Sequence, residues 1–216
     1  MIFWHLPTFT LFKPFIMKQF LFATLFTVLF CAFTVTNPTL PIGSALPQPD
    51  KKMMDISGNM ISMKEAAKNN GLLVIFSCNT CPYVIKNETR INSMVDLAQK
   101  LNIGTIIINS NEAKRDNEDS FEAMKEYAKE KRLTSFYTVD ENSQMADAFG
   151  ANRTPECFLF GKNMTLVYHG AIDDNANDEK AVKRTHLKEA MMEVSAGKPV
   201  SVPETKSIGC TIKRKP

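Results

Sequence analysis

The sequence of 216 residues has the length of one ordinary domain with an appendage. Its 26 basic and 23 acidic side chains give a formal net charge of +3, which is too balanced to indicate a nucleic-acid binder. A hydrophobic fraction of 44% and a charged fraction of 23% are typical of a globular chain and exclude wholesale disorder. Five cysteines are too few for a small domain held together by disulfides.

Residues 1–36 differ in composition from the rest of the chain. They hold nine of the 15 phenylalanines, and their only charged residues are Lys13 and Lys18. Without these two lysines, the remaining 24 basic and 23 acidic side chains leave a net charge of +1. Lys18 precedes an apolar run over 20–35, and a positive start before an apolar run is typical of a secretory signal.

Three interpretations of this leader stay open: a cleaved signal peptide, an uncleaved anchor, and lipid attachment at Cys31. The apolar run is about as long as the shortest membrane-spanning helix, which has roughly 17 residues. Phe30 stands where lipoprotein signals normally need a small residue. Every interpretation predicts export, either to the periplasm or to an anchored position facing it, with membrane contact only through an uncleaved leader. Residues 37–50 are rich in proline and predict an extended linker or a first edge segment.

The pattern over 51–197 predicts one α/β domain, which a basic tail over 198–216 follows. A hairpin over 55–62 comes first, and the other predicted elements are a short helix 63–70, strand 72–77, helix 82–101, strand 104–109, helix 117–132, strand 136–139, helix 143–149, strands 157–160 and 165–169, and helix 181–196. Ser143 can cap its helix and Gly150 can end it. Alternating strands and helices predict a parallel core sheet flanked by helices, and the late hairpin adds antiparallel strands.

The segment Cys78-Asn79-Thr80-Cys81-Pro82 carries the chemistry. It follows the buried strand directly and opens a helix, and in that context a C-x-x-C pair predicts redox activity. A cysteine at a helix N-terminus is favoured as thiolate, and a thiolate attacks a partner disulfide. We expect Cys78 to be the exposed nucleophile and Cys81 the more buried thiol that resolves the mixed disulfide.

Together with Arg153-Thr154-Pro155 before the next strand, these residues make the sequence resemble the thioredoxin superfamily over roughly residues 38–197. The hairpin, the CNTCP, YVIKNE and RTPECFLF segments and the GAIDD turn are most similar to its TlpA-like and redoxin (AhpC/TSA-related) branch. The resemblance implies a thioredoxin-like fold with an N-terminal hairpin extension. It also implies that Pro155 is cis and that the backbone of Thr154 pairs with a bound partner strand. The implied activity is thiol–disulfide exchange with protein partners and an upstream redox partner, without a cofactor.

Thioredoxin places a buried acid on the strand six residues before the first cysteine, and here that position is Leu72. Proton transfer then needs water or another group. Lys86 and Glu88 on the following helix are the nearest candidates in sequence.

Two other functions remain possible for this fold. A peroxiredoxin-like peroxidase has a reactive cysteine followed by proline, as in Cys81-Pro82, but with a threonine where this chain has Cys78. A metal or copper carrier would need further ligands, and His169 is its one candidate, at a place where a surface residue is expected. Of the other cysteines, Cys157 is expected to be a buried inert thiol.

Cys210 lies in the basic tail and is either a bystander, a further redox thiol or an intermolecular one. The tail ends in Lys213-Arg214-Lys215, which we interpret as a solvated terminus.

Overall fold

The computed structural model describes residue 1 and residues 38–215. Contacts divide the chain into Met1–Val35 and Thr36–Pro216, and the following account concerns the second unit. The predictions for the leader, including a signal, an anchor and a lipid at Cys31, lie outside the described residues. Within the part described, no helix is both long and apolar enough to cross a membrane.

A five-stranded mixed sheet with the order β5-β4-β3-β7-β8 forms the centre of the domain. β3 (Leu72–Ser77) is parallel to β4 (Gly104–Asn109), which is parallel to β5 (Phe136–Val139). On its other side β3 is antiparallel to β7 (Glu156–Phe160), which is antiparallel to β8 (Leu166–Gly170). The prediction of a parallel core extended by an antiparallel hairpin is therefore confirmed.

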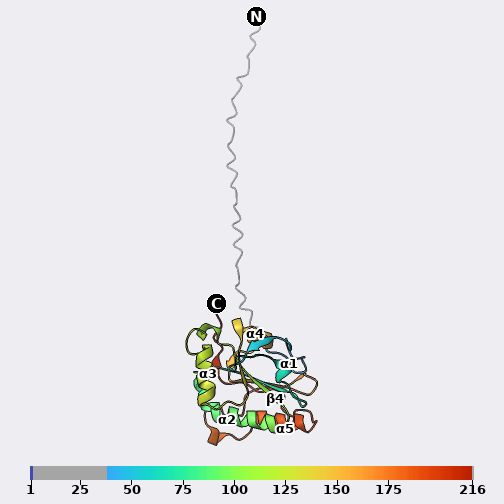
Figure 1. Cartoon of the computed structure of the whole chain (residues 1–216). Helices are drawn as coiled ribbons and strands as arrows, with labels where there is room; N and C mark the ends of the chain where they lie inside the picture. Colours follow the sequence, from blue (N-terminus) through green and yellow to red (C-terminus); the bar gives the residue numbers. More distant parts are fainter. Residues whose placement is uncertain (2–37, 216) are drawn as a thin grey trace. The chain divides into compact units, whose positions relative to one another are not determined.

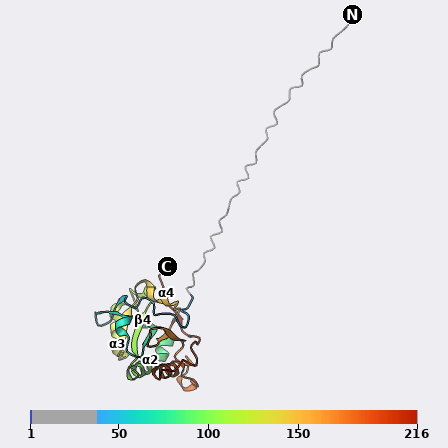
Figure 2. The same cartoon turned by 90° about the vertical axis from the view of Figure 1, so that its right-hand side faces the viewer.

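The helices cover both faces of this sheet, as Figure 1 shows for α2 and α5 on one side of β4 and for α1 and α4 on the other. Figure 2, turned by 90°, again places α2 and α4 on opposite sides of β4. The α-helices are α1 (Met63–Ala66), α2 (Pro82–Lys100), α3 (Phe121–Glu130), α4 (Gln144–Phe149) and α5 (His186–Ser195). The shorter elements are strands β1 (Lys52–Met54), β2 (Met60–Ser62), β6 (Arg153–Thr154) and β9 (Cys210–Thr211) and 3-10 helices η1 (Glu112–Lys114), η2 (Glu141–Ser143) and η3 (Glu179–Ala181).

The domain has a hydrophobic core on each face of the sheet. Strand β3 contributes side chains to both, because successive side chains point to opposite faces of a strand. Leu73 and Ile75 belong to the core that includes residues of α2, α3 and α5. Phe76 belongs to the other core, where it meets Phe149 and Phe158 edge to face. Both faces of β3 are buried, as its continuous apolar run predicts.

Several helices are shorter than predicted. Helix α1 ends at Ala66 because Ala67 adopts an extended conformation. Helix α3 begins only after Ser120, whose hydroxyl accepts the N–H of Ala123 and so caps the helix. The hairpin is present, with strands β1 and β2, but its first strand precedes Asp55 rather than including it.

Helix α4 is capped in a different way from the prediction. Ser143 stands at the N-cap position but makes no capping hydrogen bond with its side chain. The carboxylate of Asp140 instead accepts the N–H groups of Met145 and Ala146, at 2.8 and 2.9 Å. Gly150 ends the helix in a left-handed conformation, as expected.

The proline-rich segment after residue 37 packs against the domain. The backbone N–H of Leu40 donates to Phe149, and that of Leu46 donates to Met164, both at 2.9 Å. Ala45 forms an antiparallel bridge with Thr165. Of the two interpretations given for this segment, the edge segment is therefore the one observed.

Candidate active site

The two cysteines of the C-x-x-C segment lie where β3 ends and α2 begins. Cys78 follows Ser77, the last residue of β3, and Cys81 is the N-cap of α2 with Pro82 as its first residue. Proline is tolerated there because an N–H at this position has no partner within the helix. The predicted context of the motif, a buried strand followed by a helix, is confirmed.

Thr154 and Pro155 approach both thiols from the neighbouring strand. The peptide bond between them is cis, as the resemblance implied. Pairing of β7 with β3 places Glu156 opposite Phe76 and so brings the preceding residues beside the cysteines. The Sγ atom of Cys78 lies 3.5 Å from Oγ1 of Thr154, and the Sγ atom of Cys81 lies 3.1 Å from the Thr154 carbonyl oxygen.

The expected contrast in exposure between the two thiols is wrong. Cys78 is 2% exposed and Cys81 is 4% exposed, so both are buried. Both side chains contact Thr154, and a small pocket beside the two cysteines is also lined by Cys210 from the C-terminal segment. Sequence spacing could not show that the C-terminal segment lies over the thiols, because Cys210 is far from the motif along the chain.

The surroundings of the two thiols favour ionisation of Cys81, whereas the sequence predicted Cys78 as the nucleophile. Hydrogen bonds from the Cys78 and Cys210 thiols and from the N–H of Val84 lower the pKa of Cys81 to about 4, although burial opposes this. The pKa of Cys78 is raised by its hydrogen bond to Cys81, by burial and by the negative charge of Asp119. Cys81 is therefore the thiol that ionises first in the dithiol.

Asp119 is a buried acid beside the motif that the sequence analysis missed. Its carboxylate accepts the backbone N–H of Asn79 at 2.9 Å and the side-chain amides of Asn109 and Asn111 at 2.8 and 2.9 Å. Asn79 also accepts a hydrogen bond from Tyr137 at 2.8 Å. The one local sign of this network is the run of polar residues directly after the apolar strand over 104–109.

The two residues proposed for proton transfer do not contact the cysteines. Lys86 is exposed, with its amino group over the ring of Tyr83. Glu88 binds Lys131 at 3.2 Å and accepts the hydroxyl of Tyr127 at 3.3 Å. Both side chains lie on α2 beyond its first turn. They are therefore close to the cysteines in sequence but do not contact the thiols.

His169 is buried, at 7% exposure, so the expectation of a surface residue is wrong. Its Nε2 lies 2.8 Å from the carboxylate of Glu156, and that carboxylate also accepts the N–H groups of Asn152 and Arg153. The pair therefore fixes the backbone just before Thr154. In the described part of the chain, no group of three His, Cys, Asp or Glu side chains could hold a metal ion.

The remaining cysteines differ in position. Cys157 is fully buried in the sheet opposite Ile75, and burial raises its pKa, which agrees with the predicted buried thiol. Cys210 is half-buried and pairs with Thr154 across strands β9 and β6. The backbone of Thr154 thus meets the chain's own tail at the edge where a partner strand was expected.

The basic end of the tail is not a freely solvated terminus, as we had interpreted it. The N–H of Lys213 donates to Asn111 at 2.9 Å, and its carbonyl accepts the N–H of Ala113 at 2.8 Å. Arg214 binds Asp147 at 2.8 Å. These contacts are long-range, so the local charge pattern did not reveal them.

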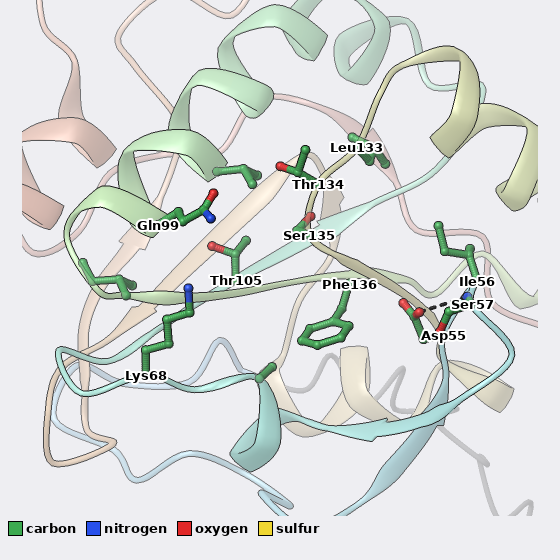
Figure 3. A pocket seen from close by; sticks show the side chains of 13 residues that line it. Asp55, Ile56, Ser57, Lys68, Gln99, Thr105, Leu133, Thr134, Ser135 and Phe136 are labelled. Atoms are coloured by element: carbon green, nitrogen blue, oxygen red, sulfur yellow. Dashed lines mark hydrogen bonds between the residues drawn. The ribbon is translucent and has the colours of Figure 1, made fainter.

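A separate pocket of about 540 Å³ lies between the C-terminal part of α2, strands β4 and β5 and the turn that follows β1. Figure 3 shows Lys68, Gln99 and Thr105 on one side of it and Asp55 with Ser57 on the other. The cysteines of the described residues do not line it. It is therefore distinct from the thiol site.

Comparison with known proteins identifies the family. The profile of the AhpC/TSA family matches residues 42–169, which include both cysteines, Thr154 and Pro155. The chain belongs to the AhpC/TSA family. Members of this family work through cysteine redox chemistry without a cofactor, so the chain is an oxidoreductase, a redoxin of the thioredoxin superfamily. The matched segment ends before the tail that carries Cys210.

Solved structures share this fold. An uncharacterized conserved protein from Geobacillus kaustophilus is 29% identical with a TM-score of 0.76, covering 82% of this chain and 93% of its own. A hypothetical protein from Sinorhizobium meliloti 1021 is also 29% identical, with a TM-score of 0.75 and coverage of 82% and 97%. The thioredoxin domain of a thiol-disulfide oxidoreductase from Bacteroides vulgatus shares the fold at 15% identity, with a TM-score of 0.51 and coverage of 61% and 89%. No curated protein sequence matches this redoxin significantly.

Proposed function

We propose that this redoxin is a thiol–disulfide oxidoreductase whose Cys78–Cys81 dithiol exchanges disulfides with protein partners outside the cytosol. One observation carries the proposal: the two thiols meet at Thr154 beside a cis peptide bond, at the N-terminus of a helix. The low pKa of Cys81 supplies the thiolate that such exchange needs. The composition of residues 1–36 supports export.

The reaction starts from the dithiol. The Cys81 thiolate attacks a sulfur of the partner disulfide, the partner's S–S bond breaks, and one partner sulfur leaves as a thiolate and takes a proton. Cys78 then gives up its proton and attacks Cys81 in the mixed disulfide, which releases the second partner thiol. Two electrons pass to the partner, and the chain holds a Cys78–Cys81 disulfide that an upstream dithiol reduces again.

In this proposal Cys81 attacks and Cys78 resolves, which reverses the roles expected from the sequence. The reason is the low pKa of Cys81, which its interactions with Cys78, Cys210 and the backbone of Val84 produce. Thr154 and Pro155 form the edge on which a partner strand would align. Because that edge pairs with the tail in the described structure, the tail must move before a partner strand can bind.

A redox titration tests the proposal. We expect the wild-type chain, equilibrated with mixtures of reduced and oxidised glutathione, to show one two-electron transition, which both Cys81→Ser and the double variant Cys78→Ser/Cys210→Ser abolish. Cys157→Ser is the matched control and should keep the transition, because Cys157 lies in the core. A midpoint near about −270 mV would indicate a reductant and one near about −120 mV an oxidant. A wild-type chain without a transition, or a transition that survives in both serine variants, contradicts the proposal.

Peroxide reduction is a second candidate function. The observation in its favour is that Cys81, followed by Pro82 and ionised at neutral pH, is a suitable attacking thiolate within an AhpC/TSA chain. A peroxide would oxidise Cys81 to a sulfenic acid and leave as an alcohol or water. A neighbouring thiol would then form a disulfide with Cys81 and release water. Peroxide consumption with dithiothreitol that Cys78→Ser retains and Cys81→Ser loses would support this function over exchange with protein disulfides.

A further inference from the structure

The tail of the chain forms a strand on the cis-proline segment. In β9, Cys210 pairs antiparallel with Thr154, and Thr211 pairs with Arg153. The guanidinium group of Arg153 donates to the carbonyl of Gly209 at 3.4 Å and to the hydroxyl of Thr211 at 3.3 Å. The chain therefore occupies its own edge at the place where an exchanging partner would present a strand.

Contacts on both sides of β9 fix its register. Before it, Thr205 and His169 form a backbone hydrogen bond of 3.0 Å. After it, the side chain of Ile212 is buried at 3% exposure and its N–H donates to the carbonyl of Asn152 at 3.1 Å. The position of Cys210 is therefore set by its neighbours in the strand, and not by its own side chain alone.

Gly209 permits this close approach. A Cβ atom at residue 209 would lie 2.2 Å from the carbonyl oxygen of Thr154 and 3.2 Å from the nitrogen of Pro155. Such distances to backbone atoms cannot be relieved by a side-chain rotation, so any larger residue would push the tail away. The glycine lies directly before Cys210 and keeps it against the site.

The thiol of Cys210 faces the redox pair. It lines a small pocket of about 180 Å³ together with Cys78 and Cys81. The interaction of the Cys81 and Cys210 thiols lowers the pKa of Cys81, and the pKa of Cys210 is raised first by burial and then by Cys81. Three cysteines thus line one small pocket.

We propose that Cys210 is a third redox thiol of this site, which attacks the Cys78–Cys81 disulfide and converts it into a Cys81–Cys210 disulfide. The inference rests on the proposed function, because the first disulfide must form there. In this step the sulfur of Cys210 loses its proton and bonds to the sulfur of Cys81. The bond between Cys81 and Cys78 breaks, and Cys78 leaves as a thiolate and takes up a proton. No electrons enter or leave the chain, and the new disulfide ties β9 to the start of α2 while it is paired with β6, so reduction is needed before a partner strand can replace it.

Disulfide mapping tests this step on the purified chain after treatment with oxidised glutathione. Remaining thiols are alkylated in acid-quenched samples with N-ethylmaleimide, and trypsin then releases peptide 69–86, which holds Cys78 and Cys81, and peptide 207–213, which holds Cys210. We expect these two peptides to be cross-linked in the wild type and in Cys78→Ser, and not in Cys81→Ser. A Cys78–Cys81 disulfide with Cys210 alkylated throughout would overturn the inference and leave the proposed function standing. If peptide 69–86 forms no disulfide of either kind, the proposed function fails as well.

Gly209→Ala tests whether the position of Cys210 on β9 is needed for the disulfide, because it moves the strand and keeps the thiol. We expect it to lower the yield of the cross-linked peptides by about tenfold or more while Cys78–Cys81 forms as in the wild type, which also shows that the variant folds. Gly161→Ala is the matched control, because its Cβ would meet only the side chain of Val167 at 3.4 Å and the carbonyl oxygen of Thr165 at 4.0 Å. An undiminished cross-link in Gly209→Ala would show that the strand pairing does not deliver Cys210 to Cys81.

Discussion

At the scale of single residues, the thiol of Cys81 is subject to two opposing influences. Burial at 4% exposure disfavours its charged form, whereas four groups favour it: the Cys78 and Cys210 thiols, the N–H of Val84 and the side chain of Thr154. The donors prevail because a thiolate at a helix N-terminus gains from hydrogen bonds and from the helix dipole together. The raised pKa of Cys78 follows from the same contact, because its proton is held toward Cys81.

Titration of the reduced protein, followed by the ultraviolet absorbance of thiolate, checks this assignment. With a pKa of about 4, Cys81 is ionised at neutral pH, and its thiolate is lost only as the pH falls through about 4. We expect Cys81→Ser to lack this thiolate. In Cys78→Ala the midpoint should rise, because the side chain that makes the largest stabilising hydrogen bond is removed. A wild-type midpoint near the ordinary value of about 8.5 would contradict the assignment.

At the scale of elements, Asp140 shows how one buried carboxylate can hold together three segments. It accepts the N–H groups of Met145 and Ala146 at the start of α4 and the hydroxyl of Ser110, at 2.7 Å, in the segment after β4. Burial raises the pKa of Asp140, and the hydrogen bonds oppose that rise. The side chain thus replaces Ser143 as the cap of this helix.

Asp140→Ala should therefore destabilise the domain by about 1–3 kcal/mol, because it leaves buried N–H donors without an acceptor. The measurement is the free energy of unfolding in urea, and Glu141→Ala is the control. Glu141 is exposed and adjacent in sequence, so its replacement should change the stability by no more than about 0.5 kcal/mol. Equal effects of the two substitutions would argue against a capping role for Asp140.

Element by element, local patterns were enough to predict much of the fold. Strand β3 is a continuous apolar run bounded by Gly71 and the cysteines, and the C-x-x-C segment stands directly between it and a helix. Features that depend on contacts between distant residues were missed. Asp119 meets Asn79 across 40 positions, and Cys210 meets Thr154 only because the tail folds back. No spacing or periodicity carries such information. The contact of Asp119 with the motif and the burial of the two thiols beneath the tail therefore could not be predicted.

At the scale of the whole molecule, a buried ion pair joins the helix of the active site to the segment after β8. Arg90 of α2 lies 2.6 Å from Asp173, with side-chain exposures of 8% and 4%. The same guanidinium group donates to the carbonyl of Asn175 at 2.8 Å. The GAIDD turn, which was part of the family resemblance, is thereby held against the helix that begins beside Cys81.

Comparison with an exposed ion pair tests whether burial, and not charge alone, makes the Arg90–Asp173 pair important for stability. Arg90→Met leaves the Asp173 carboxylate buried without its partner, and breaking a buried pair in this way should cost about 3–5 kcal/mol of unfolding free energy. Arg184→Met removes the same type of side chain from a 2.8 Å contact with Glu189, but there the two side chains are 44% and 39% exposed. Solvent replaces the lost interaction in that case, so a change of about 0–1 kcal/mol is expected. Urea unfolding of both variants at neutral pH measures the difference, and similar losses in the two would show that burial of the Arg90–Asp173 pair is not what stabilises the packing of α2.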